Sequence, residues 1–97
     1  MEMQGRVALV TGGAGGIGGA AVRALAKAGV SGVAINFRKS SNEAEELAAE
    51  IERNGVKAIA IQADVQNDAE VRGMIAKIQD HFGRLDILIN NAGVTHW

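Results

Sequence analysis

A glycine-rich segment near the N-terminus has the residue types and spacing to bind a phosphate group through its backbone. Residues 11–18 read TGGAGGIG, and they stand between the short apolar run 6–10 and a stretch with helical spacing. Glycines let a chain turn tightly and approach a ligand closely, while the first amides of a helix and its dipole attract negative charge. The segment therefore predicts a strand, a turn and a helix start that bind the diphosphate of a dinucleotide.

The glycine spacing alone does not decide between this function and a simple tight turn. Gly13, Gly15 and Gly18 satisfy the pattern GxGxxG, but overlapping versions of the pattern leave the register open. The context favours a dinucleotide site, because a strand precedes the turn, a helix follows it, and a second strand ends about twenty residues later.

The elements that must position this turn follow from the apolar pattern, which alternates between short β-rich runs and longer stretches with helical spacing. We expect one helix over 16–28 that stops at Gly29, a second that starts near Ser40 and a third that starts near Asn67. In the two later helices a Glu stands three residues after the first residue, which is the spacing of a capping box. The third helix carries an apolar stripe at Val71, Ile75, Ile78 and Phe82. The expected strands are 7–10, 33–37, 58–63 and 85–90.

Short apolar strands that alternate with helices are typical of a parallel sheet covered on both faces. Right-handed crossovers give a Rossmann-type, doubly wound α/β fold with strand order 3-2-1-4 and the turn at the carboxyl end of the first strand. Residues 1–97 are expected to form one partial NAD(P)-binding domain. The last strand would be an open edge, which recruits a strand from a continuation of the chain or from a second copy.

Composition excludes several classes of function. Ten basic and eleven acidic side chains give a net charge of −1, and no basic cluster predicts a nucleic-acid or membrane partner. The chain has no cysteine, so disulfides and thiolate catalysis are excluded. No signal peptide, membrane-length apolar run or metal-ligand spacing is visible, and we expect a cytoplasmic protein without a metal.

Two motifs in the right order resemble the short-chain dehydrogenase/reductase family. Residues 11–18 have the TGxxxGxG form of that family, and residues 90–93, NNAG, match its second signature at the expected distance. Asp64 and Val65 match a third feature, an acidic residue close to the adenine ring. The resemblance runs over 4–95, is strongest to reductases of 3-oxoacyl thioesters, and covers the N-terminal half or less of a typical member.

The resemblance implies roles for the residues of both motifs. Asn90, Ala92 and Gly93 would bring backbone against the adenosine ribose and towards the nicotinamide, and Asn91 would tie neighbouring strands together. The motif glycines would form the diphosphate turn, the residues between them would line it, and the threonine would brace it. These turn residues are Thr11, Gly12, Gly13, Ala14, Gly16, Ile17 and Gly18.

The adenosine end of the site distinguishes NADP from NAD. By resemblance, Asp64 would accept a hydrogen bond from the adenine amino group, and the Val65 N–H would donate to a ring nitrogen. An NAD site needs a carboxylate after the second strand, whereas an NADP site needs a cation for the 2′-phosphate. Phe37 stands at the acid position and Arg38 follows it, so NADP is favoured over NAD. Gly15 departs from many NADP-using members, which carry Arg or Lys there, and a solvated basic pair is the plainer alternative for Arg38.

The catalytic residues that the resemblance implies are a Tyr, a Lys four residues later and a Ser. The chain contains no tyrosine, its serines are Ser31, Ser40 and Ser41, and no lysine follows Lys77. We therefore expect the 97-residue chain to be inactive alone. Its parent would be an NADP(H)-dependent, homo-oligomeric oxidoreductase that transfers a hydride between the cofactor and a small carbonyl or alcohol.

Three explanations of the short chain stay open. The first is that the chain is the N-terminal piece of a longer reductase. The second is a non-catalytic half-Rossmann module that binds NADP or another adenine nucleotide and pairs its open edges as a dimer. The third is a gene remnant. Ligand binding separates the second explanation from the third, and the length of the parent reading frame separates the first from both.

Overall fold

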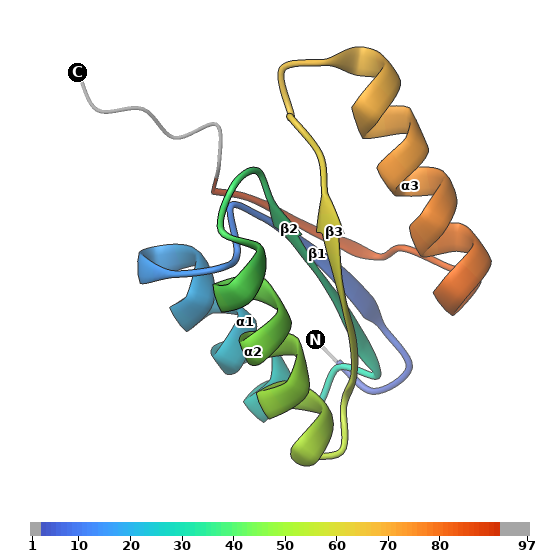
Figure 1. The fold of residues 1–97 in the computed structure, drawn as a ribbon. Helices are drawn as coiled ribbons and strands as arrows, with labels where there is room; N and C mark the ends of the chain where they lie inside the picture. The colour runs from blue at the N-terminus through green and yellow to red at the C-terminus, as the bar shows by residue number, and fades with distance from the viewer. Residues whose placement is uncertain (1–2, 92–97) are drawn as a thin grey trace.

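The computed structural model describes residues 3–91, which form four parallel strands and three helices in alternating order (Figure 1). The strands lie in the order β3-β2-β1-β4. The predicted Rossmann-type α/β fold and strand order are therefore confirmed. The elements are β1 (Val7–Thr11), α1 (Gly16–Ala28), β2 (Gly32–Phe37), α2 (Ser41–Arg53), β3 (Lys57–Gln62), α3 (Asp68–Phe82) and β4 (Ile87–Asn90).

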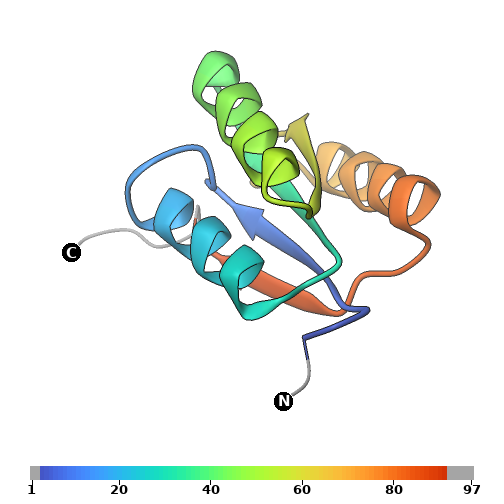
Figure 2. The same cartoon turned by 90° about the horizontal axis from the view of Figure 1, so that it is seen from below.

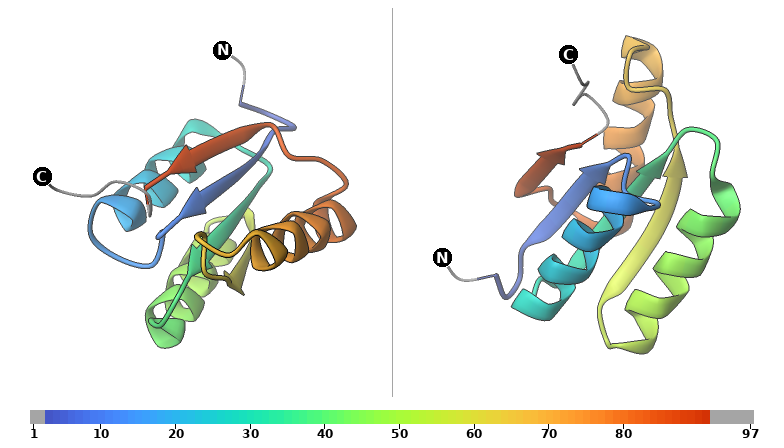
Figure 3. Two further views of the ribbon diagram at one scale, coloured as in Figure 1. Left: turned by 90° about the horizontal axis from the view of Figure 1, so that it is seen from above. Right: turned by 90° about the vertical axis from the view of Figure 1, so that its left-hand side faces the viewer.

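Helices α1 and α2 cover one face of the sheet, and α3 lies on the other face (Figure 2, Figure 3). Alternate residues of β1 point to opposite faces, so Ala8 and Val10 pack under α1 and α2 while Val7 and Leu9 pack under α3. The cluster under α1 and α2 is the larger of the two. At the β4 edge, Leu88 is 61% exposed although it pairs with Leu9 in register, so α3 leaves that part of its face uncovered.

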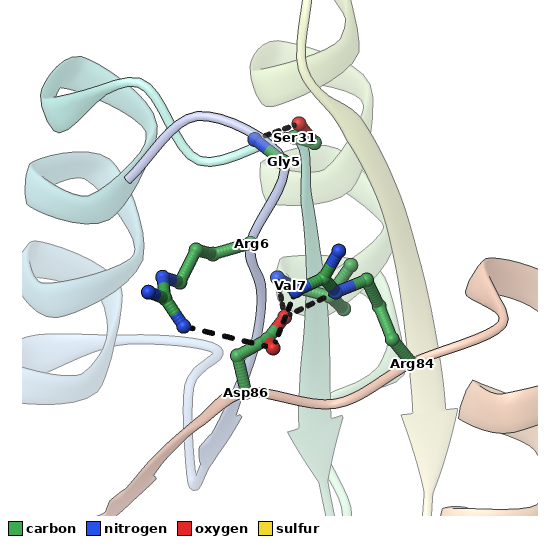
Figure 4. Close-up of polar contacts among 6 residues, drawn as sticks. All are labelled: Gly5, Arg6, Val7, Ser31, Arg84 and Asp86. Atoms are coloured by element: carbon green, nitrogen blue, oxygen red, sulfur yellow. Dashed lines mark hydrogen bonds and ion pairs between the residues drawn. The ribbon is translucent and has the colours of Figure 1, made fainter. Parts of the chain in front are cut away.

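Strand β4 starts at Ile87, two residues later than the sequence predicts. The reason is Asp86, whose carboxylate accepts a hydrogen bond of 2.8 Å from the Val7 N–H (Figure 4). The Asp86 N–H still donates to the Val7 carbonyl at 2.9 Å, but the Val7 N–H bonds to the side chain and not to a backbone carbonyl, and the regular ladder begins at the pair Ala8 and Ile87.

The predicted apolar stripe of α3 is displaced in the structure. Met74 and Ile78 are its buried residues, whereas Val71, Ile75 and Phe82 are only partly buried. Met74 and Ile78 pack in the cluster with Val7, Leu9 and Ala34 of the sheet, while Ile75 and Phe82 only pack against this cluster, so the stripe is centred on 74 and 78. The sequence pattern placed the right face within about one residue of its true centre.

The two predicted capping boxes do not form. At α2, the Ser40 side chain makes no capping hydrogen bond, and the Glu43 carboxylate instead lies beside Gly15, where an added Cβ would be 2.8 Å from its Oε2 atom. At α3, Asn67 Oδ1 does cap the Glu70 N–H at 3.1 Å. The Glu70 carboxylate, however, accepts from the Asp64 N–H at 2.9 Å rather than from the N-cap backbone, because the preceding turn brings that donor within reach.

Candidate dinucleotide-binding site

The backbone of the glycine turn resolves the register that the spacing left open. Gly12 and Gly16 have positive φ values of 61° and 57°, a region that favours glycine. A Cβ on Gly18 would collide with the Gly12 backbone and lie 2.8 Å from the Gly13 Cα atom. Gly18 belongs to both spacings, but Gly12 and Gly16, the two turn glycines with positive φ, belong only to TGxxxGxG, so the backbone favours that register.

The start of α1 presents backbone amides at the carboxyl end of β1. Its N-cap is Gly15, which has no side chain to accept a hydrogen bond, and the first turn contains no acidic residue. The first-turn amides of Gly16, Ile17 and Gly18 have no acceptor within the helix, whose first backbone bond in the turn runs from Gly19 N to Gly15 O. Ile17 is 80% exposed. The chemistry of this end of the helix is that of an anion site.

Two asparagines hold the first glycine of the turn from opposite sides. The Gly12 N–H donates to Asn36 Oδ1 at 3.1 Å, and Asn91 Nδ2 donates to the Gly12 carbonyl at 3.0 Å. The Gly13 N–H donates to the Asn36 carbonyl at 2.9 Å. Asn91 thus links β1 to the end of β4, in line with the strand-tying role that the resemblance implies. Asn36 was not singled out by the sequence, where a polar residue within an otherwise apolar strand was its only signal.

Thr11 joins the end of β1 to the end of β4. It is 5% exposed, and its Oγ1 donates to Asn90 Oδ1 at 3.0 Å. This contact brings Asn90 close to the turn and is in line with the bracing role that the resemblance implies for Thr11. Ala92 and Gly93, which the resemblance assigns to the ribose, lie outside the described residues.

Two adjoining hollows run from the turn to the end of β3. The first, of about 370 Å³, is lined by Gly12, Ala14 and Gly15 of the turn and by residues 37–40 after β2. The second, of about 110 Å³, is lined by Gly12, Asn36, Arg38 and residues 63–66. Because the two hollows share Gly12 and Arg38, part of the glycine turn, Arg38 and the predicted adenine residues Asp64 and Val65 border one groove. A hollow of about 430 Å³ beside β3 and α3 lies away from these residues.

Arg38 and Asp64 meet across the groove. Arg38 Nη2 lies 3.5 Å from Asp64 Oδ2, and the two side chains are 67% and 30% exposed. The Asp64 Oδ1 atom also accepts from the Gln66 N–H at 3.0 Å, and Gln62 Nε2 donates to the Arg38 carbonyl at 3.1 Å. Phe37, which stands at the acid position, is packed in the core cluster under α1 and α2, so the groove has no carboxylate at that position. The structure therefore brings Arg38 and Asp64 together, as an ion pair.

The described part of the chain, residues 3–91, contains no group of three or more His, Cys, Asp or Glu residues arranged to hold a metal ion. Within the same residues, no helix combines the length and the apolar character needed to span a membrane.

The fold and the glycine turn define a Rossmann-type protein, and comparison with known families identifies which kind. The family model described as short chain dehydrogenase matches residues 6–97. The chain therefore belongs to the short-chain dehydrogenase/reductase family, as the two sequence motifs predicted.

Similar proteins include both short and long relatives. The chain is 47% identical over 95 residues to the short-chain dehydrogenase/reductase homolog YusS of Bacillus subtilis, with 98% of this chain and 86% of that protein covered. It is 49% identical over 90 residues to a 3-oxoacyl-[acyl-carrier-protein] reductase of Synechocystis, with 93% of this chain and 36% of that protein covered. It thus spans most of YusS but little more than a third of the reductase.

Among solved structures, a short chain dehydrogenase from Burkholderia cenocepacia J2315 in complex with NADP matches with a TM-score of 0.90 and 46% identity. The match covers 99% of this chain and 39% of that one. The described fold is therefore that of the N-terminal Rossmann portion of the family.

Proposed function

We propose that residues 1–97 form a partial NAD(P)-binding domain that binds NADP(H) in preference to NAD. The observation that carries this proposal is the groove lined by the glycine turn, which leads into the uncapped amides of α1, and by Arg38, with Phe37 in place of an acid at the end of β2. A diphosphate needs the amides, and a 2′-phosphate needs the cation. The NADP complex of the Burkholderia dehydrogenase supports the choice of nucleotide.

Each part of the nucleotide has residues that fit it. The first-turn amides of Gly16 and Ile17 would hold the diphosphate, because the N–H groups of Gly12 and Gly13 are already bonded to Asn36. Arg38 would exchange Asp64 for the 2′-phosphate. The Asp64 carboxylate would then accept a hydrogen bond from the adenine amino group.

The whole protein, in this proposal, is a cytoplasmic, homo-oligomeric oxidoreductase that reduces a small carbonyl or oxidises the matching alcohol. The bound cofactor supplies or accepts the hydride. The similarity to a 3-oxoacyl-[acyl-carrier-protein] reductase favours 3-oxoacyl thioesters as the substrate class. The chain has no tyrosine to serve as the proton donor, so we expect it to bind nucleotide without turnover.

A second candidate function is a non-catalytic nucleotide-binding module. The observation that favours it is the match to YusS, a relative of which this chain covers 86%. The two candidates differ in activity and agree on the groove. Because both candidates predict that this chain binds NADP without turnover, the length of the parent reading frame separates them: a longer frame that encodes the Ser, Tyr and Lys supports the reductase.

The nucleotide preference is tested by Arg38→Asp. Calorimetric titration should show NADP affinity about 10- to 100-fold weaker, because a charge-assisted contact is lost and a repulsion is introduced. NAD affinity should change by less than about threefold, because NAD has no 2′-phosphate to lose a contact.

The matched control is Arg53→Asp, which makes the same charge change in the last turn of α2. It should leave both affinities unaltered. Equal losses for NADP and NAD in Arg38→Asp would remove the assignment of the 2′-phosphate. A wild-type chain that binds neither nucleotide would refute the proposed function.

A further inference from the structure

Asn36 is a polar residue buried within an apolar strand. Strand β2 reads GVAINF, and Asn36 is only 2% exposed. A buried amide is costly unless its hydrogen bonds are made, so an apolar residue would be the simpler choice for packing alone. The hydrogen bonds of this side chain therefore indicate what it does.

The Asn36 side chain bridges the two strands on either side of β2. Its Oδ1 atom accepts from the Gly12 N–H at 3.1 Å, at the end of β1. Its Nδ2 group donates to the Ala63 carbonyl at 3.1 Å, just beyond β3. The two contacts need an acceptor on one side and a donor on the other, so the orientation of the amide is determined by its partners.

The two bridged points border the same hollow of the nucleotide groove, one on its diphosphate side and one on its adenine side. Gly12 begins the diphosphate turn, and Ala63 directly precedes Asp64 on the adenine side. Gly12, Asn36 and Ala63 all line the hollow of about 110 Å³ that joins these regions. We propose that Asn36 is a positioning residue, which sets the distance between the diphosphate turn and the adenine side of the groove. The proposal rests on the proposed function, because it concerns how the same groove binds NADP.

A carboxylate in place of the amide separates the two halves of this bridge. Asn36→Asp keeps an acceptor for the Gly12 N–H but has no donor for the Ala63 carbonyl, which it would instead repel. NADP reaches both ends of the groove, whereas adenosine 2′-monophosphate reaches only the adenine side. A change in the distance between the two ends must therefore weaken NADP more than adenosine 2′-monophosphate.

The experiment is a calorimetric titration of the wild-type chain and Asn36→Asp with both ligands. We expect NADP affinity to fall about tenfold or more and adenosine 2′-monophosphate affinity to fall less than about threefold. A general loss of stability would weaken both ligands by the same factor. The matched control is Asn54→Asp, which removes an exposed bond from Asn54 Nδ2 to the Glu50 carbonyl and should alter neither affinity.

Hydrogen exchange tests the bridge without a nucleotide. The Gly12 N–H should exchange slowly in the wild-type chain and faster in Asn36→Ser, whose side chain is too short to reach it. The serine variant also serves if Asn36→Asp does not fold. Unchanged NADP affinity in a folded variant, equal losses for both ligands, or fast Gly12 exchange in the wild type would each overturn the positioning role. A wild-type chain that fails to bind NADP but protects Gly12 refutes the proposed function while leaving the bridge intact.

Discussion

The two ends of the sheet are held together by different chemistry. At the carboxyl end, the amide side chains of Asn36 and Asn91 hold Gly12 by its N–H and its carbonyl. At the amino end, the Asp86 carboxylate accepts from Arg84 Nε at 2.8 Å and from the Val7 N–H at 2.8 Å (Figure 4). Neutral groups hold the strand next to the glycine turn, and charged groups hold it at the other end.

This difference follows from what each end has to bind. A carboxylate in place of Asn36 or Asn91 would put a buried negative charge on Gly12 that competes with a phosphate for the helix dipole, whereas the Glu43 carboxylate beside Gly15 belongs to an exposed side chain of α2. Asparagine offers a donor and an acceptor without a charge, so it holds the turn and leaves the anion site attractive. The amino end carries no such site in our proposal, and there Asp86 joins β4 to β1 with the help of Arg84 and Arg6.

The largest expected effect is at the carboxyl end. Gly18→Ala places a Cβ atom against the Gly12 backbone, so the turn must shift. We expect a loss of stability of about 1–3 kcal/mol and NADP binding about 100-fold weaker or undetectable. Urea unfolding and calorimetric titration measure the two quantities.

The control for that variant is Gly73→Ala, the same substitution in α3 at a position where a Cβ meets nothing within 4 Å. It should leave NADP binding unchanged and raise stability by about 0.5–1 kcal/mol, because alanine favours the helix. Wild-type NADP affinity in Gly18→Ala would show that the turn tolerates a side chain.

A smaller effect, on stability but not on NADP binding, is expected at the amino end. Asp86→Asn removes the charge that Arg84 and Arg6 share, although an amide oxygen still accepts from the Val7 N–H. The thermal midpoint should fall by a few degrees while NADP affinity stays at the wild-type value, since the change lies at the far end of β1. Asp80→Asn, on the exposed side of α3, should change neither quantity. A marked loss of NADP affinity in Asp86→Asn would break the division between the two ends.

The smallest effect is the pH dependence of that stabilisation. The pKa of Asp86 lies below its ordinary value of 3.8 because of the hydrogen bond from Arg84, with further contributions from the Val7 N–H and the charges of Arg84 and Arg6. A carboxyl group with a lowered folded-state pKa stabilises the fold above its unfolded-state pKa, and this stabilisation is lost as pH falls through the folded-state pKa.

The difference in urea midpoint between the wild-type chain and Asp86→Asn should therefore be full at neutral pH and shrink below about pH 4. Other titrating groups, such as Glu50, are common to both proteins and cancel in the comparison. A difference that stays constant down to about pH 3 would contradict this role of the Asp86 charge.

Much of the fold was predictable because its signals are local. The apolar runs, the glycine stops and the order of the elements predicted the sheet and its strand order. The failures concern contacts made outside the local segment. Ser40 was expected to cap α2 and Glu43 to complete the box, but the Glu43 side chain lies beside Gly15 of another segment. Met74 was missed for the same reason, since its burial depends on where α3 meets the sheet.

By itself, the sequence determined the family, the glycine turn and the residues that follow β2 and β3, because motif spacing and backbone preference are properties of short segments. Only the tertiary structure decided that Asn36 holds the turn and that Arg38 pairs with Asp64. The Asn36 contacts join residues 24 and 27 positions apart. Such contacts depend on the register of neighbouring parallel strands, which an apolar pattern alone does not specify.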